Sequence, residues 1–486
     1  VAVGYAAGKA VTTGTQNTLI GGLAGDAITT GVRNTAVGYN AGSAITTGDF
    51  NTAVGRTALE NVTTADGNTA VGVAAGAQTT TGASNTAMGY LALNLNTTAD
   101  NNTGIGKSAL AANTTGAQNV AVGQEAGKSN TTGVSLAALG RQALYANTTG
   151  DNNTAIGQRA LFNNTTADSN TAVGNSALNA NTTGTLNTAV GAFALDANTT
   201  ANNNTAIGSS ALGVNTTGAN NVAIGANALD ANTTASNNNA LGLGALGANT
   251  TGASNNAFGK NSLLANTTAS NNSAFGHQAL TSNTTGEINT AIGSQSMYTN
   301  TTGFGNTAVG KGSLFTNNGN NNTAVGHEAL QANTTGGDNV AVGREALSSQ
   351  TTGGDNIAIG HLAMSTLTTA GNNVAVGDRA MQASTSGENN VAVGTLALDA
   401  NTTGGSNVAV GRDALGANTT GAENVAMGTF CLESNTTGSQ NTAIGHRALD
   451  ANTTAANNTA FGFAALGANT TGAQNTIVGA LAGDSI

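Results

Sequence analysis

The chain has 486 residues, of which 69 are glycine, none is proline or tryptophan, and only 7% are charged. The net charge of −10 comes from scattered acidic and basic residues with no basic stripe, which excludes nucleic-acid binding. No run of about 18 apolar residues is present, so we expect no membrane-spanning segment.

A series of 29 glycines runs from Gly4 to Gly479, and we call its members the anchor glycines. They are 17 residues apart, except for one step of 16 between Gly310 and Gly326. A fixed period of this length is typical of a solenoid, in which each repeat is one coil stacked on the next. We therefore predict an all-β fold, with residues 1–486 forming a single continuous parallel β-solenoid of about 28 coils. Because both ends lie inside a repeat, we expect a segment of a longer fibre.

One repeat shows how the residues are arranged around its anchor glycine. Residues 170–174 read NTAVG, residues 177–178 read Ala-Leu, and residues 181–183 read Asn-Thr-Thr. The residue before the glycine is apolar in every repeat, and Asn-Thr-Thr is a turn-forming cluster. This pattern predicts two short strands per coil, separated near the glycine and by the Asn-Thr-Thr turn.

Strand alternation assigns the residues of each repeat to two faces. Thr171 and Val173 share one face, and Ala172 and Gly174 share the other. We predict that Val173 packs against Leu178 inside the coil, which leaves a face of alanine and glycine outside. Small residues let another backbone approach closely, and a coil this thin buries little apolar surface. The pattern therefore favours an oligomer that packs through the alanine and glycine face.

Exceptions to the repeat are predicted to preserve the core and the strand register. In the first three repeats the leucine position is glycine, and an aliphatic residue follows three positions later: Gly8 and Val11, Gly25 and Ile28, Gly42 and Ile45. This exchange indicates compensation within one core. The short step at 310–326 loses its residue inside the turn at 316–319, where a deletion leaves the strand faces unchanged.

The four histidines raise the question of a metal site. His277, His327, His361 and His446 all directly follow an anchor glycine. Ten of the 13 basic residues lie one or two places after an anchor glycine, so this position is interpreted as a variable, solvent-facing turn. His327 and His361 are two coils apart, about 10 Å, which is too far to share a metal ion. We predict no metal site.

No other residues form a pattern that indicates catalysis. Cys431 occupies a small inward position and is interpreted as a buried apolar residue. Acidic residues such as Asp168, Asp196, Glu328 and Glu345 are scattered over the turns without a predicted converging pair. No glycine-rich loop opens a helix, and no calcium-binding nonapeptide is present. We therefore predict no catalytic residue, no cofactor site and no enzymatic activity.

Most repeats carry Asn-Thr-Thr, which is formally an N-glycosylation acceptor. Coils of a solenoid lie only about 4.8 Å apart, too close for a glycan on every coil. The favoured alternative is that the asparagines and threonines stack as amide and hydroxyl ladders.

The stretch NTAVGNSAL at 170–178 resembles the head repeats of trimeric autotransporter adhesins, which carry Ser/Asn-x-Ala-Ile/Val-Gly-x-x-Ala. The continuation into Asn-Thr-Thr is more similar still to the arrays of bacterial and phage tail-fibre-like proteins. The resemblance covers essentially the whole chain, and it implies a left-handed β-roll assembled as a homotrimer around the small-residue face. The adhesin repeat is commonly shorter, and no stalk, membrane-anchoring barrel or C-terminal chaperone is visible in these residues.

Three functional hypotheses follow. The first is an extracellular or cell-surface fibre, or a virion fibre, that is homotrimeric and displays variable turns to a glycan or protein receptor. The second is a monomeric solenoid that binds ice through threonines, which is disfavoured because the paired threonines lie in a turn. The third is a tail fibre that binds or cleaves host-surface glycans, for which the 3% aromatic content offers few binding residues.

Overall fold

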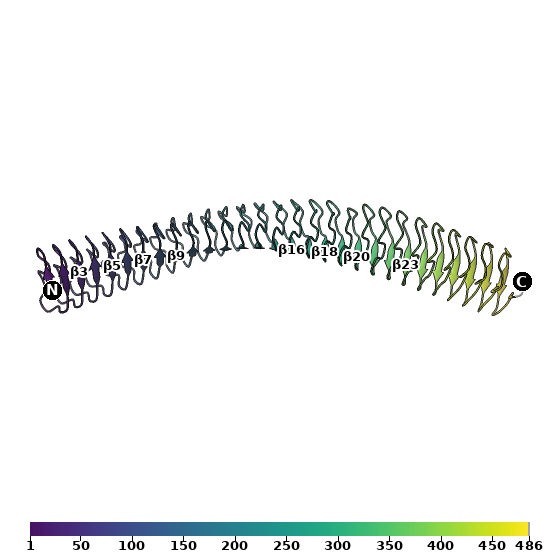
Figure 1. Ribbon diagram of the computed structural model, residues 1–486, viewed down its shortest axis with the longest axis horizontal. Helices are drawn as coiled ribbons and strands as arrows, with labels where there is room; N and C mark the ends of the chain where they lie inside the picture. Colours follow the sequence, from purple (N-terminus) through teal and green to yellow (C-terminus); the bar gives the residue numbers. More distant parts are fainter. Residues whose placement is uncertain (485–486) are drawn as a thin grey trace. The chain divides into compact units, whose positions relative to one another are not determined.

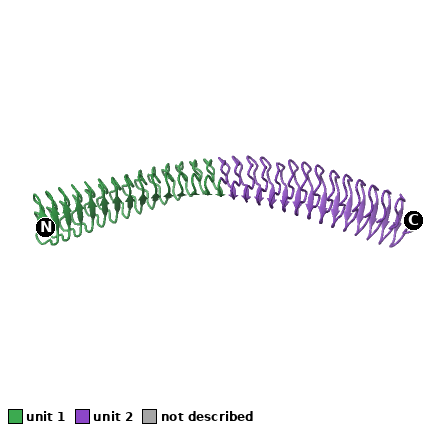
Figure 2. Ribbon diagram, in the orientation of Figure 1, with its two compact units in different colours: residues 1–243 green, residues 244–486 purple. Residues whose placement is uncertain are grey.

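The computed structural model describes residues 1–484 and contains within them 29 short strands and no helix. It divides into an N-terminal unit, Val1–Leu243, and a C-terminal unit, Gly244–Ile486 (Figure 2). Each unit is a parallel β-solenoid with one strand per coil (Figure 1). The prediction of a β-solenoid is confirmed. A single continuous stack, left-handed coiling and trimerisation stay predictions.

The strands of the N-terminal unit are β1 (Ala2–Val3), β2 (Thr18–Ile20), β3 (Thr35–Val37), β4 (Thr52–Val54), β5 (Thr69–Val71), β6 (Thr86–Met88), β7 (Thr103–Ile105), β8 (Val120–Val122), β9 (Ala137–Leu139), β10 (Thr154–Ile156), β11 (Thr171–Val173), β12 (Thr188–Val190), β13 (Thr205–Ile207), β14 (Val222–Ile224) and β15 (Asn239–Leu241). Those of the C-terminal unit are β16 (Asn256–Phe258), β17 (Ser273–Phe275), β18 (Thr290–Ile292), β19 (Thr307–Val309), β20 (Thr323–Val325), β21 (Val340–Val342), β22 (Ile357–Ile359), β23 (Val374–Val376), β24 (Val391–Val393), β25 (Val408–Val410), β26 (Val425–Met427), β27 (Thr442–Ile444), β28 (Thr459–Phe461) and β29 (Thr476–Val478).

Neighbouring strands pair in parallel, and each residue lies beside its equivalent in the next repeat. Thr154 of β10, for example, pairs with Thr171 of β11, 17 residues later. At the short repeat Thr307 pairs with Thr323, so the register survives the loss of one residue. The amide of Asn317 reaches the carbonyl of Gly319 two residues on, where the other coils span three. The deletion therefore lies in the turn, as predicted.

The prediction of two strands per coil is wrong, because the segment after the anchor glycine is a series of turns. Ser176 and Leu178 have φ of 55° and 51°, in the left-handed region that no β-strand continues through. A strand would point Ala177 and Leu178 to opposite faces, yet both are fully buried. The residues with left-handed backbone conformation turn both side chains toward the core. The backbone remains paired between coils, since Leu178 N–H donates to the Ala194 carbonyl of the next coil.

The predicted inside and outside of the strand are reversed. Ala172 is fully buried, whereas Thr171 and Val173 lie on the partly exposed face. The core consists of the strand alanine together with the Ala-Leu pair after the glycine, and wherever that leucine is present there is room for only a methyl group beneath the strand. Gly104 occupies the alanine position in β7, and a Cβ there would lie 3.2 Å from Leu93 Cγ. The alanine face is therefore the core, and no partner chain can reach it.

The predicted compensation in the first repeats is confirmed. A Cβ at Gly25 would lie 2.8 Å from Ile28 Cδ1, and one at Gly42 would lie 2.8 Å from Ile45 Cδ1. The isoleucine side chains therefore fill the space that leucine takes in later coils. Leu19 replaces the strand alanine in β2, and it reaches over Gly25 in the same way, with Cδ2 2.7 Å from that Cβ position.

Two columns of buried asparagines flank the apolar core. The strand-side asparagines lie four residues before the anchor glycines, and the turn-side asparagines, those of Asn-Thr-Thr, lie seven residues after them. On the strand side, Asn51 N–H donates to Asn34 Oδ1 at 2.9 Å, and its Nδ2 donates to the Ala65 carbonyl at 2.8 Å. On the turn side, Asn130 Nδ2 donates to Asn113 Oδ1 at 2.8 Å. The predicted amide ladder is confirmed on the turn side, and the strand-side ladder is a second one that was not predicted.

The turn-side ladder also decides between stacking and glycosylation. Nδ2, the atom to which a glycan would be joined, is buried in Asn130 and donates to both Asn113 Oδ1 and the Gly133 carbonyl. A glycan would replace one of the two hydrogens that Nδ2 donates, and it could not fit between coils at this buried atom. The folded coil therefore excludes modification at this asparagine. The threonine hydroxyls stack differently from the prediction, since Thr114 Oγ1 donates to the backbone carbonyl of Thr131.

The turn-side ladder is interrupted in the C-terminal unit, where its position is occupied by Gln350, Leu367 and Ser384. Asn333 Oδ1, Gln350 Oε1 and Ser384 Oγ are buried and have no hydrogen-bond partner among the described residues. Gln350 Nε2 bonds instead to the Ala370 carbonyl at 3.3 Å. Because the longer Gln350 side chain bonds elsewhere, the ladder lacks the hydrogen bond that would join position 350 to Asn333 Oδ1. We call one such hydrogen bond a rung of the ladder.

Gln350→Asn is expected to restore this rung and raise the free energy of unfolding by about 1 kcal/mol. The shorter amide would donate to Asn333 Oδ1, as the asparagines do in the intact ladder. Urea unfolding of the variant, beside Gln350→Ala, measures the gain. Equal midpoints for the two variants would show that the added rung contributes nothing.

Candidate functional site

The outward strand face consists of the residues one and three places before each anchor glycine. Its side chains are partly or largely exposed in every described coil, as in Ile357 and Ile359 at 38% and 40%. Thr, Val and Ile predominate, and no charged residue occurs on this face in any of the 29 strands. Exposed protein surfaces ordinarily carry interspersed charged residues that keep the protein soluble. A charge-free face that recurs in every coil is therefore the main candidate interaction surface.

The most apolar part of this face lies on β21 to β26 of the C-terminal unit. Both outward positions of these six strands carry Val, Ile or Met: Val340, Val342, Ile357, Ile359, Val374, Val376, Val391, Val393, Val408, Val410, Val425 and Met427. On β16 and β17 of the same unit, the rings of Phe258 and Phe275 stack with centroids 4.8 Å apart. The residues of this face thus align by type from coil to coil.

The N-terminal unit presents a different version of the same face. From β2 to β7 the position three before the glycine is threonine in six consecutive strands: Thr18, Thr35, Thr52, Thr69, Thr86 and Thr103. Each threonine lies beside its equivalent in the next strand, as the pairing of Thr52 with Thr69 shows. The N-terminal unit therefore carries a regular threonine row on a strand, in addition to the threonines of the turn.

The turns after the anchor glycines form a second exposed surface. The ten basic residues predicted to lie there are all exposed. Several rest on aromatic rings, with the Arg412 guanidinium 4.9 Å from the centroid of Phe430 and that of Arg159 5.0 Å from the centroid of Phe162. This surface varies from coil to coil, in contrast to the uniform strand face.

The histidines of this turn surface have different surroundings. His446 stacks on Phe463 with ring centroids 5.4 Å apart. His361 lies between Arg344 Nη2 at 2.8 Å and Asp378 Oδ1 at 2.9 Å, and Arg344 occupies the coil between His361 and His327. An arginine between the two histidines adds to the predicted separation as a reason why they do not share a metal ion.

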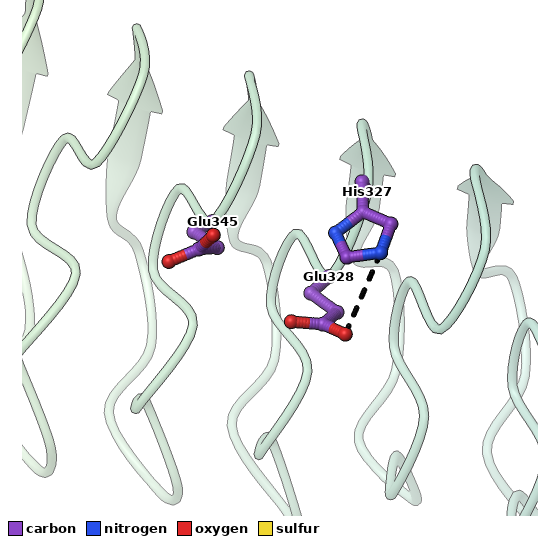
Figure 3. A group of neighbouring side chains, drawn as sticks. All are labelled: His327, Glu328 and Glu345. Carbon is purple, nitrogen blue, oxygen red and sulfur yellow. Dashed lines mark ion pairs between the residues drawn. The ribbon is translucent and has the colours of Figure 1, made fainter.

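The prediction that no acidic residues converge is wrong at one place. The carboxylates of Glu328 and Glu345 and the imidazole of His327 each offer a donor atom, and all three atoms lie within 4.8 Å of one another (Figure 3). His327 Nε2 is 3.6 Å from Glu328 Oε1. Sequence reasoning compared histidines only with each other and did not consider the glutamates one position later in adjacent repeats.

Cys431 is buried where most repeats have alanine, as predicted, and its Sγ contacts the Ala443 carbonyl at 3.1 Å. Burial raises the pKa of the thiol to about 12 from an ordinary value of 9.0. The thiolate is the nucleophilic form of cysteine. The buried thiol is therefore unreactive at neutral pH.

The raised pKa predicts that Cys431 destabilises the fold in alkaline solution. Because the folded state favours the neutral thiol, stability is unaffected below about pH 9 and falls as the pH rises toward about 12, by about 1.4 kcal/mol per unit. Unfolding of the parent chain and of Cys431→Ala, compared at each pH, isolates this contribution from other titrating groups. Parallel stability curves for the two proteins up to pH 11 would contradict the prediction.

No model of a known protein family matches this chain, and no curated protein matches it. The resemblance to adhesin heads and tail-fibre arrays therefore rests on the repeat motif alone. The described residues include no helix long and apolar enough to cross a membrane.

Proposed function

We propose that the chain is a structural and adhesive fibre, located outside the cell or on a virion, that assembles with copies of itself through the outward strand face. The observation that carries this proposal is the complete absence of charge from that face, in a chain with 36 charged residues elsewhere (13 basic and 23 acidic). A face that only met water would gain solubility from lysine or glutamate at some of these positions. A face that is covered by another chain would gain no solubility from charged residues at these positions.

The size of the face supports the same proposal. Strands about 4.8 Å apart, with outward residues about 7 Å apart along each strand, give a strip of about 500 Å² on each unit. The largest apolar patch of an ordinary monomer is about 300–600 Å², and a stable interface covers about 800 Å² per partner. The strip on one unit is smaller than such an interface, whereas the strips of both units, about 1,000 Å² together, offer enough area to hold a partner.

The proposed assembly is a homotrimer, because the adhesin heads that the repeats resemble are trimers. It differs from the expected trimer in the face it uses, because the strand alanines lie in the core of each coil and the Thr, Val and Ile side chains face outward. In this arrangement the turns after the anchor glycines are not part of the shared face, and their basic residues stay exposed. These turns would contact the glycan or protein receptor.

Lysine on the outward strand face is expected to dissociate the assembly without unfolding the coils. Val374→Lys combined with Val391→Lys would place two unpaired charges in a buried interface, at a cost of several kcal/mol. The matched control is Thr395→Lys with Thr429→Lys, which adds the same charge next to anchor glycines, where Lys107 and Lys311 already occur. Sedimentation should show one chain for the first variant and the parent mass for the control. Equal masses for all three proteins would contradict the proposal.

A second candidate function is ice binding. The sequence disfavoured it, but one observation of the structure supports it. The six threonines from β2 to β7 lie on a strand face rather than in a turn, at the regular spacing of a parallel sheet. Thermal hysteresis of the cold protein, lost in Thr52→Lys with Thr69→Lys, would support this function in place of the fibre. A freezing point equal to that of buffer would exclude it.

A further inference from the structure

Three potential metal ligands meet on the surface of the C-terminal unit, in the turns that follow two anchor glycines. His327 and Glu328 are the first and second residues after Gly326, and Glu345 is the second residue after Gly343. Their donor atoms lie within 4.8 Å of one another, and Figure 3 shows the three side chains projecting from two neighbouring coils. His327 is 45% exposed and Glu328 is 32% exposed, so an ion could enter from solvent.

A second histidine of the same unit shows what is special about this group. His277 occupies the same repeat position, but the two glutamates are replaced there by Gln278 and Gln295. These amides satisfy each other, with Gln295 Nε2 donating to Gln278 Oε1 at 3.3 Å. Two carboxylates in the same places cannot donate to each other, and their charges repel. A bound cation would relieve this repulsion.

We propose that His327, Glu328 and Glu345 bind one zinc ion. Imidazole nitrogen and carboxylate oxygen are both zinc ligands, with bonds of about 2.0–2.2 Å, so two donors of a tetrahedral site lie about 3.4 Å apart. His327 Nε2 and Glu328 Oε1, at 3.6 Å, already have this separation. Glu345 reaches it by rotation of a partly exposed side chain, and water supplies the fourth ligand.

The surrounding charges are compatible with this assignment. The two carboxylates balance the charge of the ion, and the imidazole binds in its neutral form. Arg344 Nε lies 3.6 Å from Glu345 Oε1 and is 58% exposed, so this ion pair is weak and the arginine can turn away when zinc binds.

Calorimetric titration of the full chain with zinc chloride tests the proposal, with one ion per chain expected. Glu328→Gln with Glu345→Gln converts the site into the arrangement around His277, and should weaken binding at least about tenfold. His277→Ala is the matched control and should leave zinc binding unchanged. The reverse change, Gln278→Glu with Gln295→Glu, should create a second site and raise the stoichiometry to two.

Two results would overturn the proposal. One is zinc binding of equal affinity in the parent chain and in the Glu328→Gln, Glu345→Gln variant. The other is the absence of measurable heat when the parent chain is titrated. Far-UV circular dichroism of each variant confirms that the coils are retained, so a loss of binding can be assigned to the ligands.

Discussion

Gly123→Ala is expected to disrupt the stack at a single coil and to lower the free energy of unfolding by about 4 kcal/mol. Gly123 has φ of 136°, a conformation that residues with a side chain rarely adopt. A Cβ at this position would also lie 2.6 Å from the Gly140 carbonyl oxygen in the next coil. That atom is backbone held in register by the neighbouring strands, so it cannot move aside as a flexible side chain could.

The matched control is Gly22→Ala. Gly22 directly follows an anchor glycine, and a Cβ there would meet only the Tyr39 ring, at 3.5 Å. Hydrogen exchange should show fast exchange confined to the coils around β8 and β9 in Gly123→Ala, because each repeat contacts only its neighbours. Equal stability of the two variants would refute a steric role for the anchor glycines.

Asn130→Ala is expected to cost about 3 kcal/mol, because it leaves several buried polar groups unpaired. In the intact ladder, Asn130 Nδ2 donates to Asn113 Oδ1 and to the Gly133 carbonyl, and Asn130 Oδ1 accepts from Asn147 Nδ2. Alanine removes all three bonds at once, in a region where water cannot replace them.

Thr132→Ala changes an exposed side chain two residues away in the same turn and is the natural comparison. Urea unfolding should separate the two variants clearly, with the threonine variant close to the parent chain. If both variants unfolded at the same urea concentration, the asparagine ladder would not be a main source of stability.

The 17-residue period was enough to predict the coils and their register, because each strand pairs with its equivalent one repeat later. It could not decide which face lies inside. Alternation groups Asn170 with Ala172, and Thr171 with Val173, but either pair can face the core. Valine is the more apolar choice, and the structure buries alanine and asparagine instead because the ladder satisfies the amides. The adjacent apolar pair Ala177 and Leu178 was a sequence signal against a second strand, because strand alternation would bury only one of the two.

The candidate sites were predictable to different degrees. The exposure of the turn after the glycine followed from its variable, charged composition. The group at His327 was missed because its three residues come from two repeats and from two positions. Aligning the repeats and comparing His327-Glu328 with His277-Gln278 would have revealed it.

The mass of the chain in solution tests the central claim most directly, namely that the outward strand face is covered by copies of the same chain. Light scattering during size-exclusion chromatography of the unmodified chain should give three times the chain mass of 46.9 kDa, unchanged on dilution. A single mass of 46.9 kDa at all concentrations would contradict it, since the charge-free face would then be open to solvent.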